Sequence, residues 1–309
     1  MILILTEEAD YSSCMVIEWL LFYNINFIRV NETDILTVDF ILNDIKIKSK
    51  SNFLLLSNIK GIWYRRGFLN LKLKLTNDDD LDRFRMQEFK KIKEYLYYKL
   101  SLLPNINRYT NSDVNKLIVS DHARNLGLRT PEEFIISNIV YINNLNINTL
   151  ATKSITGSTI FDYDNHFVIG YTELLKNIIL PENDFFPTLI QNYIRKKYEL
   201  RIFFLHGIFY SMAIFSQIDN STKVDFRNYN RKNPNRNVPF ALPCEVIEKL
   251  TSLMDKLKLN SGSIDMIVTP ENDFVFLEVN PIGQYGMVSN PCNYNLNKKI
   301  ADFYKNLNL

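Results

Sequence analysis

Three side chains with oxygen atoms lie close together in the sequence near its C-terminal end. Residues 274–281 have the composition of a strand, and side chains alternate along a strand, so Glu278 and Asn280 are expected on one face. Asp265 lies in the preceding predicted strand, 263–268, and a hairpin would bring it to that face. Mg²⁺ prefers such hard oxygen ligands. The pattern predicts a magnesium site, and the alternative is a solvated strand edge with polar residues by chance. The apolar residues are expected on the opposite face: Val275, Leu277 and Val279.

Two lysines could hold phosphate groups, because lysine carries a compact point charge. They are Lys116 and Lys153. Lys153 is followed by Ser154, Gly157 and further small hydroxyl residues, which let backbone N–H groups approach a polyphosphate. The spacing is not that of a Walker A loop. Taken singly, each lysine is more often a surface residue.

An extended segment before a predicted strand could bind a nucleotide base through its backbone groups. Glu199 could then accept hydrogen bonds from ribose hydroxyls, and Arg201, on the same strand face, could grip a phosphate or carboxylate. The alternative is an ordinary strand with an exposed ion pair. The segment consists of Gln191, Asn192, Tyr193 and Ile194.

Two basic clusters are ambiguous. Residues 222–238 are polar and predict a long loop, in which Arg227 could stabilise charge on a transferring phosphoryl group. Arg231 lies in the same stretch. A second cluster ends an early predicted strand and could meet an acidic substrate, or could simply be solvated. It consists of Tyr64, Arg65 and Arg66.

The elements that position these residues predict an α/β (α+β) protein. Strands at 1–5 and 26–30 flank a helix at 14–23, capped by Ser12 or Ser13, which indicates a parallel α/β lobe. A long helix follows at 82–102. Further on, His206-Gly207 predicts a hairpin between two strands. The expected domains are 1–105, 106–190 and 191–309, with helices predicted at 113–126 and 244–257.

Composition excludes several other classes. The 309 residues are 46% apolar and 23% charged, and the net charge of +2 gives no reason to expect a nucleic acid or membrane partner. The three cysteines are far apart and predict neither a disulfide framework nor a zinc site. No basic signal-peptide start and no apolar run of about 20 residues is present, so a cytoplasmic location is expected.

The order of these signals resembles the ATP-grasp superfamily over about residues 110–309, with a first lobe like the usual pre-ATP-grasp domain. Within it, the chain resembles ligases that make microviridin-type ω-ester and ω-amide peptides (graspetides), and is most similar to peptide maturases of grasp-with-spasm systems. That likeness depends on 61–66 (GIWYRR), 126–131 (LGLRTP), 225–227 (DFR), 238–243 (VPFALP) and 280–284 (NPIGQ).

The resemblance implies that Lys116 and Lys153 hold ATP phosphates and that one or two Mg²⁺ ions bind Asp265, Glu278 and Asn280. An acidic side chain of a ribosomal precursor peptide with a leader segment would be phosphorylated, with Arg201 and Arg227 neutralising charge. Ser or Thr hydroxyls or Lys amines would then close macrolactones or macrolactams. Related ligases are often dimers, so a homodimer is possible. The alternatives are a RimK-like ligase that adds an amino acid, and a non-catalytic peptide-binding scaffold.

Overall fold

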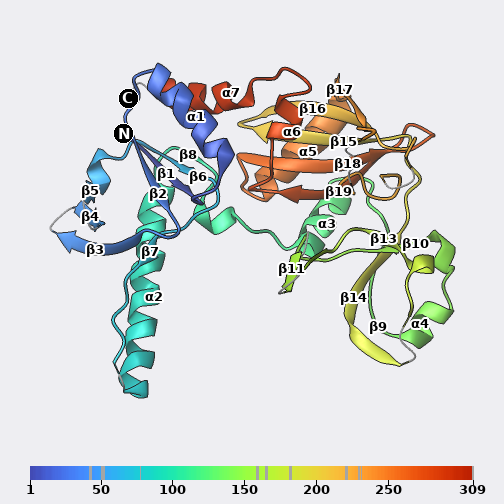
Figure 1. Ribbon diagram of the computed structural model, residues 1–309, viewed down its shortest axis with the longest axis horizontal. Helices are drawn as coiled ribbons and strands as arrows, with labels where there is room; N and C mark the ends of the chain where they lie inside the picture. Colours follow the sequence, from blue (N-terminus) through green and yellow to red (C-terminus); the bar gives the residue numbers. More distant parts are fainter. Residues whose placement is uncertain are drawn as a thin grey trace. The chain divides into compact units, whose positions relative to one another are not determined.

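The computed structural model describes residues 1–41, 44–49, 53–76, 78–157, 160–163, 166–180, 183–219, 222–228, 230 and 232–307. These residues form two compact units. Unit 1 comprises Met1–Asp113 together with Asn295–Leu309, and unit 2 comprises Val114–Tyr294. The last fifteen residues, which the sequence assigns to a third domain, therefore join the first unit (Figure 1). None of the described helices has the length and apolar character needed to span a bilayer.

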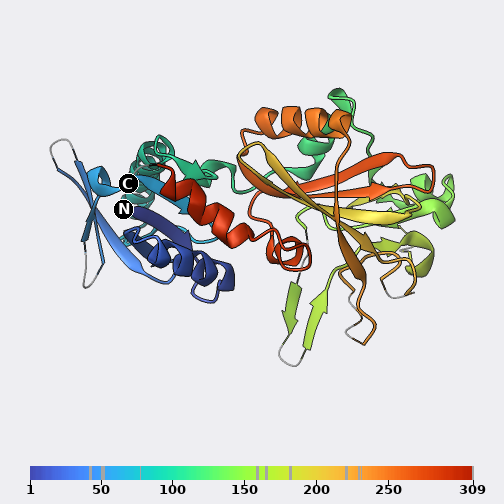
Figure 2. The same ribbon diagram turned by 90° about the horizontal axis from the view of Figure 1, so that it is seen from above.

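Unit 1 is built on a parallel sheet of order β2-β1-β6-β8. The predicted strand–helix–strand opening is confirmed, and β1 is wholly buried. Helices α1 and α7 pack against each other (Figure 2). The elements are β1 (Ile2–Thr6), α1 (Tyr11–Phe22), β2 (Phe27–Asn31), β6 (Gly61–Tyr64), β8 (Asn105–Ile106) and α7 (Leu296–Lys305).

The predicted cap of α1 is wrong. Asp10, and neither Ser12 nor Ser13, is the N-cap, and its Oδ2 accepts a hydrogen bond of 2.9 Å from the backbone N–H of Ser13. A carboxylate is the stronger acceptor and also complements the positive end of the helix dipole. The Ser13 hydroxyl donates to the same oxygen, so it supports the cap.

Unit 1 also contains a small sheet of order β5-β4-β3-β7 and a long helix, α2. Asp78 caps α2, which is the predicted long helix with a start three residues earlier than expected. The small sheet was not predicted. Its strands are β3 (Ile35–Ile41), β4 (Asp44–Lys48), β5 (Phe53–Leu55) and β7 (Asn70–Leu71), and α2 spans Asp79–Ser101.

Unit 2 begins with α3 (Lys116–Asn125), which Asn115 caps. A four-stranded sheet of order β13-β10-β14-β9 follows, with a small core that contains Ile136, Ile142 and Ile190. Its elements are β9 (Glu133–Asn138), α4 (Ile139–Asn143), β10 (Leu150–Thr152), β13 (Glu173–Leu174) and β14 (Asp184–Asn192). A separate hairpin joins β11 (Ile160–Tyr163) to β12 (His166–Ile169).

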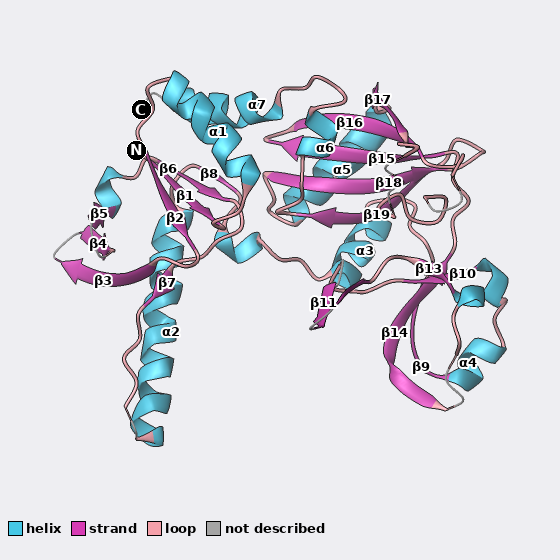
Figure 3. Cartoon of the chain, viewed as in Figure 1, coloured by secondary structure: helices cyan, strands magenta, loops and turns pink. Residues whose placement is uncertain are grey.

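The rest of unit 2 is an antiparallel sheet of order β17-β16-β15-β18-β19 (Figure 3). One face forms the main core with α3 and α5, through residues such as Leu200, Ile264 and Met266. The strands are β15 (Tyr198–Leu205), β16 (Ile208–Phe215), β17 (Arg236–Phe240), β18 (Ser261–Val268) and β19 (Phe274–Asn280), and the helices are α5 (Cys244–Lys256) and α6 (Gly286–Ser289).

Two predictions about this sheet have opposite outcomes. The hairpin at His206-Gly207 is confirmed: both residues have positive φ, 44° and 85°, as a two-residue type I′ turn requires. The loop predicted over 222–238 is wrong at its end, because residues from Arg236 onward form β17 and pair with β16. Pairing with an existing strand edge satisfies the backbone groups of this polar segment, so it needs no apolar pattern of its own.

Candidate active site

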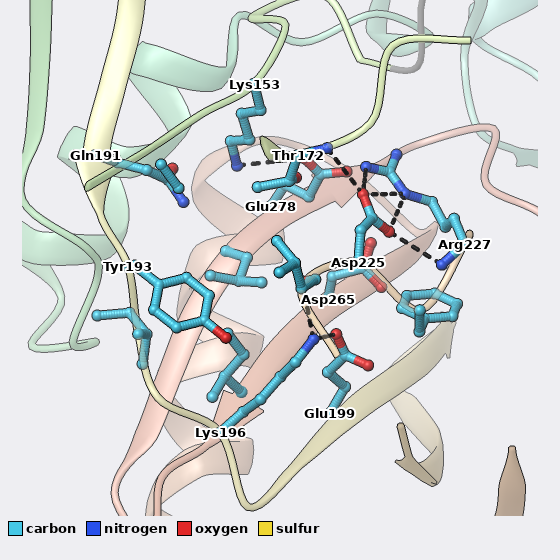
Figure 4. Close-up of a pocket in the computed structure, with 16 residues that line it drawn as sticks. Lys153, Thr172, Gln191, Tyr193, Lys196, Glu199, Asp225, Arg227, Asp265 and Glu278 are labelled. Carbon is cyan, nitrogen blue, oxygen red and sulfur yellow. Dashed lines mark hydrogen bonds and ion pairs between the residues drawn. The ribbon is translucent and has the colours of Figure 1, made fainter. Parts of the chain in front are cut away.

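A pocket in unit 2 lies between the polar face of the five-stranded sheet and the strands of the smaller sheet (Figure 4). Glu199, Asp265 and Glu278 reach it from the first sheet, and Lys153 and Gln191 reach it from the second. Its volume of about 80 Å³ is small for a nucleotide.

Glu278 is the centre of the pocket's charged end. Its Oε2 lies 2.9 Å from the Nζ of Lys116 and 3.6 Å from the Nζ of Lys153, and its Oε1 accepts a hydrogen bond of 3.0 Å from Asn280. Burial acts to raise the pKa of Glu278, but the two lysines and Asn280 outweigh it and hold that pKa at about 2. The predicted meeting of Lys116, Lys153, Glu278 and Asn280 is confirmed.

Asp265 lies directly opposite Glu278 in the β18–β19 ladder, as predicted. It pairs with Arg201, which lies opposite it on β15. Burial raises the pKa of Asp265 despite that arginine. The Oδ1 of Asp265 and the Nε of Arg201 are buried with no hydrogen-bond partner in the described part of the chain. Such atoms are available to hydrogen-bond a water, an ion or a ligand that enters the pocket.

The expected alternation along β19 is broken at Leu277. The register shifts between Asp265 and Met266, so that Asp265 pairs with Glu278 and Met266 pairs with Phe276. Leu277 is the extra residue of a β-bulge, and it lines the same pocket as Glu278 instead of facing away from it. The prediction for Leu277 is therefore wrong.

Glu199 is the third carboxylate that reaches the pocket from the five-stranded sheet. It is buried, pairs with Lys196, and accepts a hydrogen bond of 2.9 Å from the hydroxyl of Ser216. Burial raises the pKa of Glu199 to about 7, and Lys196 only partly opposes this. The sequence did not single out Lys196, because it lies in a basic run, 195–197, that is typical of a surface. Its Nζ also donates to the backbone oxygen of Val224 at 3.0 Å.

Arg227 lines the pocket from the polar loop, and Asp225 fixes its position. The Nε of Arg227 donates to both carboxylate oxygens of Asp225, at 2.9 and 3.1 Å. Asp225 also accepts a hydrogen bond of 3.0 Å from the backbone N–H of Thr172, which joins two loops at the pocket. These bonds, together with the charge of Asp225, raise the pKa of Arg227, so it stays cationic. Arg231 lies outside the described residues.

The predicted base-binding segment contributes three side chains to the lining. Gln191, Tyr193 and Ile194 line the pocket, and the Oε1 of Gln191 is buried without a partner among the residues described. The side chain of Asn192 instead donates to Glu132 at 2.7 Å. Asn192 therefore does not line the pocket, and the other three residues of the segment do.

The small-residue loop after Lys153 approaches the charged end of the pocket. Gly157 has a φ of +111°, and a Cβ there would lie 3.4 Å from the Nζ of Lys116. The Ser154 and Thr156 hydroxyls are 2.9 Å apart. Ser154 is not among the residues that line the pocket, so its predicted role in binding phosphate stays a prediction.

Tyr64, Arg65 and Arg66 belong to unit 1. Tyr64 packs edge-on against Tyr109. Arg65 is buried, with its Nε 3.5 Å from Asp10, whereas Arg66 is partly exposed and lies 3.4 Å from Glu7. Arg65 therefore has a structural ion pair within unit 1. A role of the three residues in substrate binding stays a prediction.

The residues present fit a magnesium ion held jointly with phosphate. Asp265 and Glu278 offer carboxylate oxygens on neighbouring strands, and Asn280 adds an amide. Within the described ranges, no group of three or more His, Cys, Asp or Glu side chains could hold a metal. Two carboxylates and an amide leave an incomplete shell, which suits Mg²⁺ because it usually keeps waters and substrate phosphates as ligands.

Two carboxylates and an amide on one sheet face, with two lysines opposite them, are groups of the kind that a nucleotide and its Mg²⁺ need. No family model matches the sequence, and no curated protein matches it either. Solved structures do resemble the whole chain. A RiPP-associated ATP-grasp ligase from Chryseobacterium gregarium, solved with ADP and a leader and core peptide, is 22% identical with a TM-score of 0.77, over 99% of this chain and 96% of that one.

Two further structures are similar. The macrocyclase MdnC from Microcystis aeruginosa, bound to its precursor peptide MdnA, is 24% identical with a TM-score of 0.73, over 99% of both chains. The ATP-grasp ligase PsnB, solved with a precursor variant, Mg and ADP, is 12% identical with a TM-score of 0.67, over 100% of this chain and 98% of that one. The chain therefore has the ATP-grasp fold, and the likeness extends over its full length.

Proposed function

We propose that this protein is an ADP-forming ATP-grasp ligase that crosslinks side chains of a ribosomally made precursor peptide. An Asp or Glu carboxylate oxygen of the peptide attacks the γ-phosphorus of ATP, and ADP leaves. A Ser or Thr hydroxyl, or a Lys amine, then attacks the acyl carbon and displaces phosphate. Each ester or amide formed removes one water from the peptide.

The observation that carries the proposal is a pair of buried polar atoms in one pocket. Gln191 and Asp265 both line the pocket, and Gln191 Oε1 and Asp265 Oδ1 are buried with no partners in the described chain. A nucleotide with its metal would satisfy both. The fold is that of ligases solved with ADP, Mg and precursor peptides, which supports this choice of ligand and of partner.

Each side chain has a role that its contacts support. Lys116 and Lys153, which now neutralise Glu278, would bind phosphate oxygens once Mg²⁺ takes their place at that carboxylate. Bound there, Mg²⁺ would neutralise charge on the phosphates. Arg201 and Arg227 would neutralise charge that develops on the phosphoryl group during its transfer. Glu199 would accept hydrogen bonds from ribose. A cytoplasmic setting, where ATP is abundant, is part of the proposal.

The test combines the protein with ATP, Mg²⁺ and the candidate precursor encoded beside its gene. We expect ADP release and a peptide lighter by one water per crosslink, measured by mass spectrometry. A mass gain would instead indicate addition of an amino acid, and no ADP release with any peptide would indicate a scaffold. Either result would reject the proposal.

A pair of variants connects activity to the pocket. Glu278→Gln should reduce ADP release at least about 100-fold, because it removes a charged metal ligand. Glu245→Gln is the matched control, since Glu245 is an exposed glutamate on α5 that pairs only with Lys249 among the described residues. Circular dichroism should show both variants folded. Equal activity of the two variants would remove Glu278 from the mechanism.

A further inference from the structure

Lys196 is a buried lysine in a basic run whose other members are exposed. Its side chain is 1% exposed, whereas its neighbours Arg195 and Lys197 face water. Burial of an ammonium group is costly unless other groups compensate its charge and its hydrogen-bonding capacity. The Nζ of Lys196 contacts the carboxylate of Glu199 and donates a hydrogen bond of 3.0 Å to the backbone oxygen of Val224 (Figure 4). Lys196 therefore joins Glu199 on β15 to a second part of the chain.

Val224 belongs to the loop that carries Arg227, residues 222–228. It directly precedes Asp225, whose carboxylate binds the guanidinium of Arg227. The same carboxylate accepts hydrogen bonds of 3.0 Å from the backbone N–H groups of Arg227 and Thr172. The backbone at Val224 is thus one residue away from the group that fixes the position of Arg227 in the pocket.

Glu199 has a second connection to this loop. Its Oε2 accepts a hydrogen bond of 2.9 Å from the hydroxyl of Ser216, and the backbone oxygen of Ser216 accepts one of 2.9 Å from the hydroxyl of Thr222. Its Oε1 contacts Lys196. Both carboxylate oxygens of Glu199 therefore reach the 222–228 loop through a single intermediate residue.

Glu199 can accept further hydrogen bonds from a ligand. A carboxylate has about four lone-pair positions, and Lys196 and Ser216 are its side-chain donors in the described part of unit 2. Glu199 also lines the pocket. Hydrogen bonds from a ligand to the ionised carboxylate favour its charge, and a charged acceptor binds an ammonium group more strongly than a neutral one does. A ligand that donates to Glu199 should therefore strengthen the contact with Lys196.

We propose that Lys196 is a positioning residue that couples ribose bound at Glu199 to the loop that carries Arg227. The inference rests on the proposed function, in which ribose hydroxyls donate to Glu199. Those hydroxyls hold Glu199 ionised, Glu199 holds Lys196, and Lys196 holds the backbone oxygen of Val224. Arg227 is then fixed most firmly when a nucleotide with an intact ribose occupies the pocket.

This coupling gives the site a way to distinguish ATP from other phosphate compounds. Lys116 and Lys153 would bind phosphates through charge, which any polyphosphate can satisfy. Inorganic tripolyphosphate lacks ribose, so it would bind without strengthening the contact between Glu199 and Lys196. Arg227 would then be less firmly held than it is with a ribonucleotide.

Hydrogen–deuterium exchange followed by mass spectrometry tests the coupling. The reporters are fragments that contain the backbone N–H groups of Thr172 and Arg227, because both groups bond to Asp225. The protein is saturated with ADP or with 2′,3′-dideoxy-ADP, each with Mg²⁺, so that occupancy is equal. ADP should slow exchange in these fragments at least about 5-fold more than dideoxy-ADP does. Tripolyphosphate should protect them no better than dideoxy-ADP.

The affinities of the two nucleotides give a second measurement. Calorimetric titration should show that dideoxy-ADP binds the wild type about 10-fold more weakly than ADP, because it lacks the hydroxyls that bond to Glu199. This comparison also establishes the concentrations at which both nucleotides saturate the protein.

Lys196→Met removes the ammonium group and keeps a similar chain length. ADP and dideoxy-ADP should then slow exchange at Thr172 and Arg227 equally. The affinity ratio of the two nucleotides should fall from about 10 to about 3, because hydrogen bonds to a neutral carboxyl group are about half as strong as those to a carboxylate. The matched control is Lys197→Met, since Lys197 is exposed and its Nζ bonds to Asn272 at 2.9 Å. This control should behave like the wild type.

A second variant keeps the test valid if Lys196→Met is unstable. Lys196→Met leaves Glu199 buried without its cation, whereas Lys196→Met with Glu199→Gln removes both charges. Circular dichroism should show the double variant folded. It should also lose the difference in exchange between the two nucleotides.

Three results would overturn the proposal. They are equal protection of the wild-type loop by both nucleotides, a difference that persists in both Lys196 variants, and loss of the difference in Lys197→Met. None of these measurements uses a peptide, so they are separate from the proposed reaction. A protein that crosslinks its peptide without ribose-dependent protection would reject the role of Lys196 alone. Ribose-dependent protection without crosslinking would reject the proposed reaction alone.

Discussion

At the scale of single residues, burial has a larger effect on the pKa of Glu199 than its ion pair with Lys196 has. Burial raises its pKa from an ordinary value near 4.5 to about 7 even though Lys196 lies beside it. The folded protein therefore holds a proton between these pH values that the unfolded chain has released. As pH rises from 4.5 to 7, Glu199 should lower the free energy of unfolding.

The Glu199→Gln variant isolates this effect. Its stability relative to the wild type should increase by about 3 kcal/mol between pH 4.5 and 7.5, because Gln does not titrate. Chemical denaturation at several pH values measures the difference. Parallel pH profiles for the two proteins would contradict the raised pKa.

Gln191 separates stability from nucleotide binding. Its Oε1 is buried and has no partner within the described ranges, so Gln191→Leu should leave the free energy of unfolding unchanged or raise it by about 1 kcal/mol. If the oxygen accepts a hydrogen bond from adenine, the same change should weaken ATP binding about 5- to 10-fold.

Calorimetric titration and thermal unfolding measure the two quantities. Asn192→Ala is the control, because that side chain bonds Glu132 and is not among the residues that line the pocket. Its ATP affinity should match that of the wild type. A Gln191→Leu protein that binds ATP normally would place adenine elsewhere.

The positions of two carboxylates in the pocket could be predicted from the sequence. Asp265 and Glu278 followed from a hairpin and from strand periodicity, and their register pairing agrees. Lys196 could not be predicted, because its buried position depends on Glu199 and on the backbone oxygen of Val224, which lies more than twenty residues further along the chain. Charge in a sequence does not reveal exposure.

At the scale of elements, one extra residue changes which side chains share a face. With the bulge at Leu277, Phe276 joins the core while both Leu277 and Glu278 line the pocket. Periodicity assumes one residue opposite one, so it predicts faces only between irregularities. The β15–β16 hairpin was predictable because its turn is encoded locally by a glycine.

The turn itself gives a sharp stability test. Gly207 has a φ of +85°, and nothing lies within 4 Å of a Cβ placed there. Gly207→Ala should therefore cost about 1–2 kcal/mol through backbone strain alone. Gly286 is the matched control, because its surroundings are equally open and its φ is not positive, so Gly286→Ala should be neutral or slightly stabilising. Equal unfolding temperatures for the two variants would contradict the strain.

Strands β3 and β17 show where local patterns are insufficient. Strands β5 and β7 are short, and much of the apolar surface of β3 is exposed. The residues of β3 therefore show no alternation between a buried and an exposed face. For β17, the pairing partner is β16, more than twenty residues away, and the intervening chain is polar. Such strands form because the edge of a neighbouring strand offers backbone groups with which they can pair.

At the scale of the whole chain, the C-terminal helix completes the unit at the N-terminus. Tyr304 of α7 is fully buried, and its hydroxyl donates a bond of 2.8 Å to the backbone oxygen of Ile62 on β6. Gly61 leaves the space for its ring, since a Cβ there would lie 3.1 Å from it. This helix was not predicted from the sequence, and neither was its packing against residues of the first unit.

Removing that ring should destabilise unit 1. Tyr304→Ala should lower the free energy of unfolding by about 3–5 kcal/mol, whereas Phe303→Ala, one residue earlier and partly exposed, should cost about 1 kcal/mol. Limited proteolysis should show cleavage in residues 1–113 first, with unit 2 still resistant. Cleavage that begins in unit 2 would mean that α7 does not stabilise unit 1.

The return of α7 to unit 1 has a consequence for synthesis on the ribosome. Unit 2 is a continuous stretch, 114–294, and all of its strands have emerged before α7 is translated. Unit 1 lacks α7 until Leu296–Lys305 leave the exit tunnel, so the face of α1 that packs on α7 stays open to water until then. The segment made first therefore completes its fold only after every strand of unit 2 has been translated.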